Sequence, residues 1–375
     1  NKLGIFCVVI YESKMSNIMF RKISSKLLHQ KSFHCKINYN FISSFALVYE
    51  ECGEPLSVLQ YKDVSQSIES PEGNQILIQH LASPINPVDI NVIQGVYLFK
   101  PKLPAVGGGE GVAKVIQVGN QVKNLAIGDW VVPSQHKYGT WATHSIINSN
   151  DVVKIDNSID VLCAAQLTVN PSTAYRMLKD FVDLKQGTCI CKLDNFYWYF
   201  LSLGDSIIQN GANSAVGLYI IQLAKHFDVK TINVVRNRPE LDQLKERLQS
   251  YGADVVLTEE ELRKKDLMGN IFNKIPRPKL ALNCVGGKSA TDCLRHLDLK
   301  GTMVTYGAMS RQPLTIPAGA LIFYDQRFFG FSIGAWFREN YANGKQSELF
   351  DHLCDLFKQG TIKPPETIQL KLQDY

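Results

Sequence analysis

Short apolar runs separated by glycine, proline and asparagine dominate residues 46–155. The runs read ALVYE, QILIQHLAS, GVAKVIQVG, DWVVPS and WATHSIIN. Runs this short, with turn residues between them, are typical of strands joined by tight connections. The pattern predicts a β-rich, partly barrel-like domain in this part of the chain.

From about Val161 the pattern changes to amphipathic helices that alternate with apolar strands. A helix is expected over LCAAQLTVNPSTAYRML, and the segments after it read DSIIQN, VGLYIIQLAKHF, TINVVR, PELDQLKERLQSYG, DVVL, KLALNCVG, SATDCLRHL and GTMVTYG. Strands that alternate with helices build a parallel sheet covered on both faces. We therefore expect an α/β fold, with a doubly wound parallel sheet of the Rossmann type beside the β-rich domain. Another helix is expected over Leu349–Lys358.

The composition is that of a globular protein. Of 375 residues, 45% are hydrophobic and 20% are charged, with a mean hydropathy of -0.08. No apolar run approaches the length of about 20 residues that a transmembrane helix requires. The nine cysteines are scattered without paired CxxC spacing, which favours reduced thiols over a disulfide framework or a structural zinc site.

The formal net charge of +5 lies almost entirely at the amino end. The first 49 residues contain a single acid, Glu12, against the basic residues Lys2, Lys14, Arg21, Lys22, Lys26, Lys31 and Lys36. A basic, acid-poor segment that can gather its apolar residues on one helical face is typical of an organellar transit peptide, which we expect over residues 1–45. The alternative is a disordered tail or translated upstream sequence. The remainder is close to neutral, so nothing in it argues for nucleic acid as a partner.

A dinucleotide site is predicted where one strand passes into a helix. The segment DSIIQN is followed by a turn of small residues, Asn210–Gly217, and then by an amphipathic helix. Small residues let the backbone approach a pyrophosphate, whose charge suits a helix N-terminus. The glycines do not follow a strict G-x-G-x-x-G pattern, because Asn213 and Ala215 interrupt them, so a plain structural turn is the alternative.

The next strand, Thr231–Val235, ends in Arg236-Asn237-Arg238. Enzymes that use NAD place an acid near this strand end, whereas arginine there can hold the 2′-phosphate of NADP. The sequence therefore favours NADPH, with two solvated surface arginines as the alternative. Further strand ends at Asn283–Gly287 and Tyr306–Met309 would meet the cofactor at the carboxyl edge of the sheet.

Several long strings resemble the zinc-independent mitochondrial trans-2-enoyl-CoA (enoyl-thioester) reductases of the medium-chain dehydrogenase/reductase superfamily. They are NPVDINVIQGVY, LPAVGGGEGVAKV, LTVNPSTAYRML, TINVVRNRPE, LTEEELR, LALNCVGGKSATDCLR and GTMVTYGAMSRQP. The resemblance implies a GroES-like catalytic domain over 46–169 and 335–375 and an NADPH-binding Rossmann domain over 170–334. It also implies NADPH-dependent reduction of enoyl thioesters of CoA or acyl carrier protein, for fatty acid synthesis in the mitochondrial matrix, by a homodimer.

The same resemblance implies the site residues. The family's proton donor is a tyrosine that matches Tyr97, and a phenol can give the proton that the substrate's α-carbon needs once hydride has reached the β-carbon. The positions that match cofactor contacts are Asn170, Asn213, Ser214, Ala215, Val216, Arg236, Asn237, Arg238, Tyr306, Gly307, Ala308, Met309, Phe331, Ser332 and Ile333.

No catalytic metal is expected. Zinc-dependent relatives carry Gly-His-Glu and cysteine ligands, whereas this chain reads GGGEG at Gly107–Gly111 and has no cysteine near Asn86–Asp89. A catalytic zinc needs three protein ligands. We interpret Glu110 as a buried, hydrogen-bonded carboxylate that orders the glycine-rich loop.

Three features depart from the family pattern. Deleting Thr188–Gly204 restores the uninterrupted string DLKQGDSIIQN, which suggests a retained in-frame intron or a gene-model error; a genuine insertion is the alternative. Family members continue past Gln373–Tyr375 with a helix, a strand and a cofactor-binding lysine, so the catalytic domain is expected to be truncated at its C-terminus. Ser332 stands where the family commonly has an aromatic residue beside the substrate pocket.

Two other functions remain open at this point. The first is an NADPH-dependent quinone oxidoreductase of the same superfamily, which also lacks zinc. The second is a catalytically impaired binding protein, because the insertion and the missing tail could both disturb the site.

Overall fold

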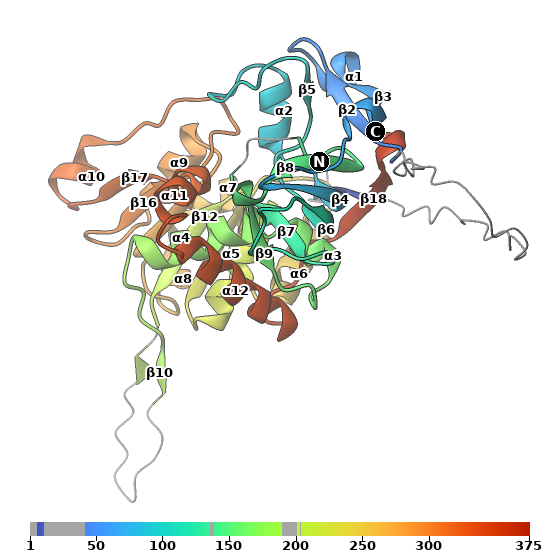
Figure 1. Ribbon diagram of the computed structural model, residues 1–375. Helices are drawn as coiled ribbons and strands as arrows, with labels where there is room; N and C mark the ends of the chain where they lie inside the picture. Colours follow the sequence, from blue (N-terminus) through green and yellow to red (C-terminus); the bar gives the residue numbers. More distant parts are fainter. Residues whose placement is uncertain (1–5, 11–41, 136–138, 190–200, 203) are drawn as a thin grey trace, which may run out of the picture.

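The computed structural model describes residues 6–10, 42–135, 139–189, 201–202 and 204–375. A β-rich domain and a parallel α/β domain lie side by side (Figure 1). The expected α/β fold, with its Rossmann sheet and β-rich partner, is confirmed. No helix among these residues has the length and apolar character that crossing a bilayer would require.

The β-rich domain contains two sheets. In the larger one, antiparallel pairing links β4, β6, β7 and β9 in order, and β8 adds to β4. The smaller one has the order β3-β2-β5. The strands are β2 (Phe45–Tyr49), β3 (Gln60–Asp63), β4 (Gln75–Pro84), β5 (Ala105–Val106), β6 (Val112–Val118), β7 (Trp130–Pro133), β8 (His144–Asn148) and β9 (Val152–Ile155). The short helices are α1 (Pro55–Val58), η1 (Ser65–Ser67), α2 (Pro87–Ile93) and η2 (Ser149–Asp151).

Both ends of the described chain join the larger sheet. Strand β1 (Phe6–Ile10) pairs in parallel with β18 (Thr367–Lys371) and antiparallel with β4. A 3-10 turn, η3 (Leu372–Asp374), follows β18. Residues 6–10 therefore belong to a sheet of the β-rich domain although they fall within the segment predicted to be a transit peptide. The remainder of that prediction lies outside the described residues, and its boundary at residue 45 stays a prediction.

The α/β domain is built on a six-stranded parallel sheet with the order β14-β13-β12-β15-β16-β17. Its strands are β12 (Ser206–Asn210), β13 (Lys230–Val235), β14 (Val255–Thr258), β15 (Leu280–Asn283), β16 (Thr302–Thr305) and β17 (Arg327–Gly330). Its helices are α5 (Ala215–His226), α6 (Leu241–Tyr251), α7 (Glu259–Leu262), α8 (Lys265–Phe272), α9 (Gly287–Leu294) and α10 (Ala318–Ile322). The chain then forms α11 (Ile333–Asn340) and α12 (Lys345–Lys358).

Neighbouring residues of one strand enter different cores. Ile207 belongs to the apolar cluster that contains residues of α5, whereas Ile208 belongs to the cluster that contains residues of α8 and α9. This follows from the alternation of side chains along a strand, and it explains why the strands of this sheet are apolar throughout. The cluster of Ile207 also includes Val112 of β6 and Phe350 of α12. A shared core therefore joins the two domains.

The single helix expected over residues 162–178 is wrong. The structure has two helices, α3 (Val161–Ala165) and α4 (Asn170–Asp180), with a break between them. Pro171 in the first turn of α4 has no N–H to offer to a preceding turn, which favours a helix start there. The N–H of Val169 is donated to the side chain of Glu110, as described below.

The base of the insertion is a short antiparallel ladder. Strand β10 (Thr188–Cys189) pairs with β11 (Leu201–Ser202), at the position labelled β10 in Figure 1. The aromatic residues 196–200 of the insertion lie outside the described residues. The two ends of the insertion lie close together, because a Cβ atom added to Gly204 would be 2.5 Å from the backbone nitrogen of Gly187.

Candidate functional site

Side-chain amides join the carboxyl ends of three neighbouring strands. Asn210, which ends β12, donates from Nδ2 to Oδ1 of Asn283, which ends β15, at 2.8 Å. Asn283 donates in turn to Oγ1 of Thr305 at the end of β16, at 3.1 Å. Asn210 Oδ1 also accepts the backbone N–H of Cys284 at 2.9 Å. These bonds fix the loops at the sheet edge where a dinucleotide binds in folds of this type.

The turn between β12 and α5 is shaped for close approach. Gly211 has a φ of +60°, and a Cβ atom there would lie 2.5 Å from the Cys284 sulfur. Gly217 packs against the backbone of Ala212, with only 2.5 Å between an added Cβ and the Ala212 oxygen. Ser214 caps α5 by accepting the N–H of Gly217 at 3.1 Å. The predicted residues Asn213, Ser214, Ala215 and Val216 thus form the N-terminal turn of α5, where backbone N–H groups favour an anion.

Two further predicted groups lie at the same edge of the parallel sheet. The segment Tyr306–Met309 follows β16, and the N–H of Met309 is donated to the Cys284 carbonyl at 3.0 Å. The segment Phe331–Ile333 follows β17, and the N–H of Phe331 is donated to the Thr305 carbonyl at 3.0 Å.

The members of these two groups differ in exposure. The hydroxyl of Tyr306 is buried beside Ser214 and Cys284, and burial raises its pKa well above the ordinary value. Ser332 is exposed and caps α11, whereas Ile333 is buried.

The predicted 2′-phosphate group is a cationic turn after β13. Arg236 and Asn237 are exposed, and Nε of Arg238 donates to the Arg236 carbonyl at 3.3 Å. Partial burial, and then the positive charges of Arg236 and Arg247, lower the pKa of Arg238 from its usual value. A site where neighbouring cations lower the pKa of Arg238 is a favourable place for an anion.

This edge fits a phosphorylated dinucleotide. A glycine-containing turn leads into the N-terminus of α5, and an arginine pair follows the neighbouring strand β13. The buried hydroxyl of Tyr306, from the loop after β16, lies beside Ser214 of that turn. Among the residues that the structure describes, no three His, Cys, Asp or Glu side chains converge as a metal site would require.

Tyr97 lies on the loop that follows α2. The backbone N–H groups of Val96 and Tyr97 both reach the Asn91 carbonyl of α2, at 3.0 and 3.2 Å, so the helix end sets the position of the loop. The tyrosine side chain is 41% exposed. Its hydroxyl forms no hydrogen bond to another described residue, and it is open to an incoming molecule.

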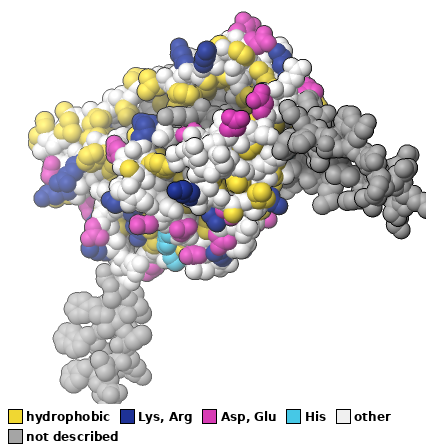
Figure 2. All heavy atoms as spheres, viewed as in Figure 1, with side chains coloured by type: hydrophobic (Ala, Val, Ile, Leu, Met, Phe, Trp, Pro, Cys, Tyr) yellow, Lys and Arg dark blue, Asp and Glu magenta, His cyan; other side chains and the backbone are white. Residues whose placement is uncertain are grey.

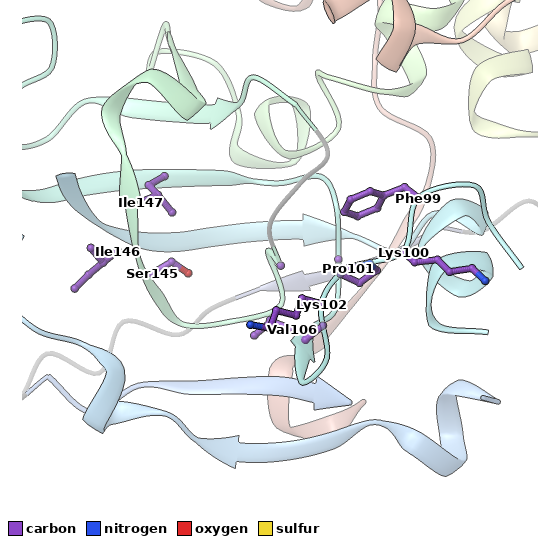
Figure 3. A pocket seen from close by; sticks show the side chains of 11 residues that line it. Phe99, Lys100, Pro101, Lys102, Val106, Ser145, Ile146 and Ile147 are labelled. Atoms are coloured by element: carbon purple, nitrogen blue, oxygen red, sulfur yellow. The ribbon is translucent and has the colours of Figure 1, made fainter. Parts of the chain in front are cut away.

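A cavity of about 450 Å³ lies beside the Tyr97 loop (Figure 3). Phe99, Lys100, Pro101 and Lys102 line one part of it, and residues 145–147 of β8 line another. Apolar walls with lysines at the rim suit a ligand that has an apolar chain and an anionic group.

Glu110 is buried and hydrogen-bonded, as predicted, but its partners differ from those expected. Its side chain leaves the glycine-rich loop and reaches α2 and the break between α3 and α4. Asn86 Nδ2 donates to Oε2 at 2.7 Å, and Thr168 Oγ1 and the Val169 N–H donate to Oε1 at 3.0 and 2.6 Å. Burial raises the pKa of Glu110 to about 8 in spite of these three donors.

Asp89 holds the glycine-rich loop instead. Its carboxylate accepts the N–H of Asn86 at 2.7 Å and the N–H of Gly109, and burial raises its pKa to about 7. Trp141 packs on the same loop so closely that a Cβ atom on Gly107 or Gly108 would lie 2.4 Å from its ring.

Sequence reasoning singled out none of Asn86, Asp89 and Thr168 as site residues. The available signal was Asn-Pro-Val-Asp at Asn86–Asp89, which is a helix start with a polar cap and an acid in the first turn. That signal predicts a cap, and the contacts across the fold could not be read from it. The structure also adds Asn170 to this network, since its Nδ2 donates to Asn86 Oδ1 at 3.2 Å.

The two domains match known families. Residues 72–157 match the alcohol dehydrogenase GroES-like domain, and residues 215–346 match the zinc-binding dehydrogenase family. A curated relative from Xenopus tropicalis, named as a mitochondrial enoyl-[acyl-carrier-protein] reductase, is 45% identical over 339 residues, covering 90% of this chain and 91% of the relative.

Solved structures agree with this assignment. The complex of Etr1p with NADP and crotonyl-CoA superposes with a TM-score of 0.79 at 35% identity, covering 88% of this chain and 92% of that one. A mitochondrial 2-enoyl thioester reductase heterodimer from Candida tropicalis gives a TM-score of 0.77 at 35% identity, with coverage of 87% and 92%. A putative NADPH:quinone reductase from Bacillus thuringiensis is more distant, at 26% identity, a TM-score of 0.72 and coverage of 86% and 89%.

Proposed function

The chain belongs to the family of mitochondrial enoyl-[acyl-carrier-protein] reductases, and from that premise we propose that it reduces trans-2-enoyl thioesters to saturated acyl thioesters with NADPH. The observation that carries this conclusion is the near full-length match to that family. It is joined by the likeness to a structure whose complex contains both NADP and crotonyl-CoA. The protein is accordingly a mitochondrial oxidoreductase of fatty acid synthesis.

Cofactor binding is proposed for the carboxyl edge of the parallel sheet. The N-terminal turn of α5, from Asn213 to Val216, would hold the pyrophosphate, and Arg236, Asn237 and Arg238 would hold the 2′-phosphate. Tyr306–Met309 and Phe331–Ile333 would flank the nicotinamide and its ribose, with Asn170 on the nicotinamide side. Bound NADPH supplies the hydride.

The chain's own residues would then complete the reduction. Hydride addition at the β-carbon leaves an enolate on the thioester, and a new C–H bond at the α-carbon needs one proton. We assign that proton to the hydroxyl of Tyr97, which is exposed on its loop and has no hydrogen-bond partner among the described residues. The phenolate is reprotonated from solvent, so that one hydride and one proton are consumed per double bond.

A homodimer is expected through the edge of the parallel sheet at β17. This edge carries exposed apolar side chains, among them Phe323 at 75% and Ile322 at 70% exposure, with Phe329 on β17 itself. Hydrophobic side chains gather over this part of the molecule at the upper left of Figure 2. An exposed strand edge with an apolar rim is unfavourable in water and favourable against a second copy.

The test is a pair of assays on the purified protein. Crotonyl-thioester-dependent oxidation of NADPH without turnover of an ortho-quinone is the expected result. The opposite pattern would favour the quinone oxidoreductase. NADPH binding with neither activity would favour the catalytically impaired binding protein.

A further inference from the structure

The carboxylate of Glu110 links the segment that precedes Tyr97 to the segment that precedes Asn170. Its side chain is only 1% exposed, and it lies at the junction of the β-rich domain with the polypeptide that leads into α4. One oxygen is bound to Asn86 at the start of α2. The other is bound to Thr168 and Val169, the last two residues before α4.

Each of these contacts leads to a residue with a proposed chemical role. On one side, Asn86 begins α2, and the carbonyl of Asn91 in that helix holds the backbone of Tyr97. A seven-residue helix is a rigid connection of about 10 Å, so a shift at its first turn is transmitted to the loop at its end. On the other side, Val169 directly precedes Asn170, the residue proposed for the nicotinamide side.

A direct bond closes this arrangement. Asn170 Nδ2 donates to Asn86 Oδ1 at 3.2 Å, while Asn86 Nδ2 donates to Glu110. The orientation of the Asn86 amide is thereby fixed at both ends. The main chain of Glu110 is held as well, because Thr140 Oγ1 donates to its carbonyl at 2.8 Å. Removing the carboxylate would leave three buried donors without their acceptor.

We propose that Glu110 is a positioning residue. Through its hydrogen bonds with Asn86, Thr168 and Val169, it fixes the positions of Asn170 and the Tyr97 loop relative to each other. The proposal rests on the proposed function for the roles of Tyr97 and Asn170. Glu110 itself touches neither substrate nor cofactor in this scheme. A misplacement of about 1 Å at a reacting group can lower a rate by about 100-fold, which makes such a link kinetically important.

The experiment compares Glu110→Ala and Glu110→Gln with a matched control, Asp292→Asn. Asp292 is also a buried carboxylate, 2% exposed, but it is held by Arg263 and Arg295 on the far side of the parallel sheet. All three variants lose a buried carboxylate, so all three are expected to lose stability. Thr168→Val, which removes one donor and keeps the volume, serves if the Glu110 variants do not fold.

Two measurements separate positioning from stability. With crotonyl-CoA, we expect Glu110→Ala to lower kcat by about 10- to 100-fold and to increase the primary isotope effect with 4-deuterated NADPH. Asp292→Asn should leave both unchanged once they are corrected for the folded fraction. Glu110→Gln, which keeps one acceptor oxygen, should recover part of the rate.

The second measurement needs no turnover. The fluorescence enhancement of bound NADPH reports how firmly the nicotinamide is held, whereas the affinity reports chiefly the phosphate contacts. We expect Glu110→Ala to reduce the enhancement with an NADPH affinity within about threefold of the wild type, a change of less than about 1 kcal/mol. If Glu110→Ala shows the same fluorescence enhancement and the same isotope effect as Asp292→Asn, the proposal is overturned. A wild type without enoyl reduction would instead overturn the proposed function, and the fluorescence comparison would still decide the role of Glu110.

Discussion

Lys185 and Asp205 are hydrogen-bonded to each other twice across the base of the insertion. The N–H of Lys185 donates to Asp205 Oδ2 at 2.7 Å, and the N–H of Asp205 donates to the Lys185 carbonyl at 2.9 Å. Asp205 also pairs with Lys279 at 2.8 Å, which fixes it to the parallel sheet. These two hydrogen bonds hold together the segments that enter and leave the insertion, directly before strand β12.

Deletion of Thr188–Gly204 should therefore leave a folded protein. Gly187 and Gly204 are already in close contact, so joining residue 187 to 205 requires little movement. We expect the deletion variant to unfold at a temperature no lower than the full chain and to bind NADPH equally well. Differential scanning calorimetry and NADPH titration measure both. A longer deletion that also removes Asp205 is the control and should be less stable. If the protein that lacks Thr188–Gly204 fails to fold, the insertion is a genuine part of the structure.

The elements with strong local patterns could be predicted from the sequence. The strands β12 to β16 and the helices α5, α6 and α9 lie at the predicted segments, because the strands are apolar throughout and these helices are amphipathic. The helices α7 and α8 were not predicted. Pro171 is a local signal for the break before α4, but the acceptor of the Val169 N–H at that break is Glu110, a residue far away in sequence that no local pattern indicates. Strands β1 and β18 were also missed, since their pairing joins the two ends of the chain.

The candidate site shows the same limit. Family motifs predict the cofactor contacts, and the structure brings Ser214, Tyr306 and Phe331 to one edge of the parallel sheet, after β12, β16 and β17. The sequence predicts that Glu110 is a buried, hydrogen-bonded carboxylate, which is confirmed, but it does not predict which residues bind it. Its partners belong to segments that no single-sequence pattern connects, because hydrogen bonds between side chains leave no periodic signal.

Stability should fall as the pH rises through the pKa values of two buried acids. Burial raises the pKa of Asp89 to about 7 and that of Glu110 to about 8, above the ordinary values of 3.8 and 4.5. Both pKa values are higher in the folded than in the unfolded chain. The two protonated acids therefore stabilise the folded protein fully below about pH 4, and this contribution is lost progressively as the pH rises to about 8. A tenfold change in an acid dissociation constant corresponds to about 1.4 kcal/mol, so the loss is large enough to measure.

Glu110→Gln removes one of these two contributions. We expect the free energy of unfolding of the wild type to decrease more steeply between about pH 5 and pH 8 than that of the variant, as measured by urea denaturation. The pH dependence that remains in the variant reports the titration of Asp89, whose negative charge also raises the pKa of Glu110. Parallel curves for the two proteins would contradict this prediction.

Arg236 and Arg238 should determine the preference for NADPH. Each is expected to contact the 2′-phosphate, and a hydrogen bond to a charged group contributes about 1.5–3 kcal/mol. The double variant Arg236→Ala, Arg238→Ala should bind NADPH at least about 10-fold more weakly. NADH, which lacks the phosphate, is the internal control and should bind unchanged. If fluorescence titrations show that the double variant loses affinity for NADPH and NADH equally, the two arginines do not determine the preference for NADPH.

Lys100 and Lys102 should recognise the phosphate of the acyl carrier. Both line the cavity beside the Tyr97 loop, and neither forms an ion pair with another residue in the described parts of the chain. Replacing both by alanine should raise the KM for crotonyl-CoA up to about 30-fold at low salt, because each of the two exposed contacts contributes up to about 1 kcal/mol. The KM for crotonyl-N-acetylcysteamine, which has no phosphate, should not change. Lys123→Ala, an exposed lysine elsewhere in the same domain, is the control. A rise of KM for both substrates would mean that the lysines shape the cavity rather than bind an anion.

Tyr97→Phe tests the proton donor directly. The variant keeps the ring and removes only the hydroxyl, so the loop held by Asn91 should be preserved. General acid catalysis contributes about 10²- to 10⁴-fold, and we expect crotonyl-thioester reduction to slow by a factor in that range with little change in NADPH affinity. Tyr61→Phe is the matched control, because Tyr61 is 37% exposed and stacks on Phe45 in the β-rich domain away from the cofactor edge. If hydride transfer still occurs in Tyr97→Phe, the solvent isotope effect should change while the effect of deuterated NADPH remains. An unchanged rate would remove Tyr97 from the mechanism and assign the proton to water.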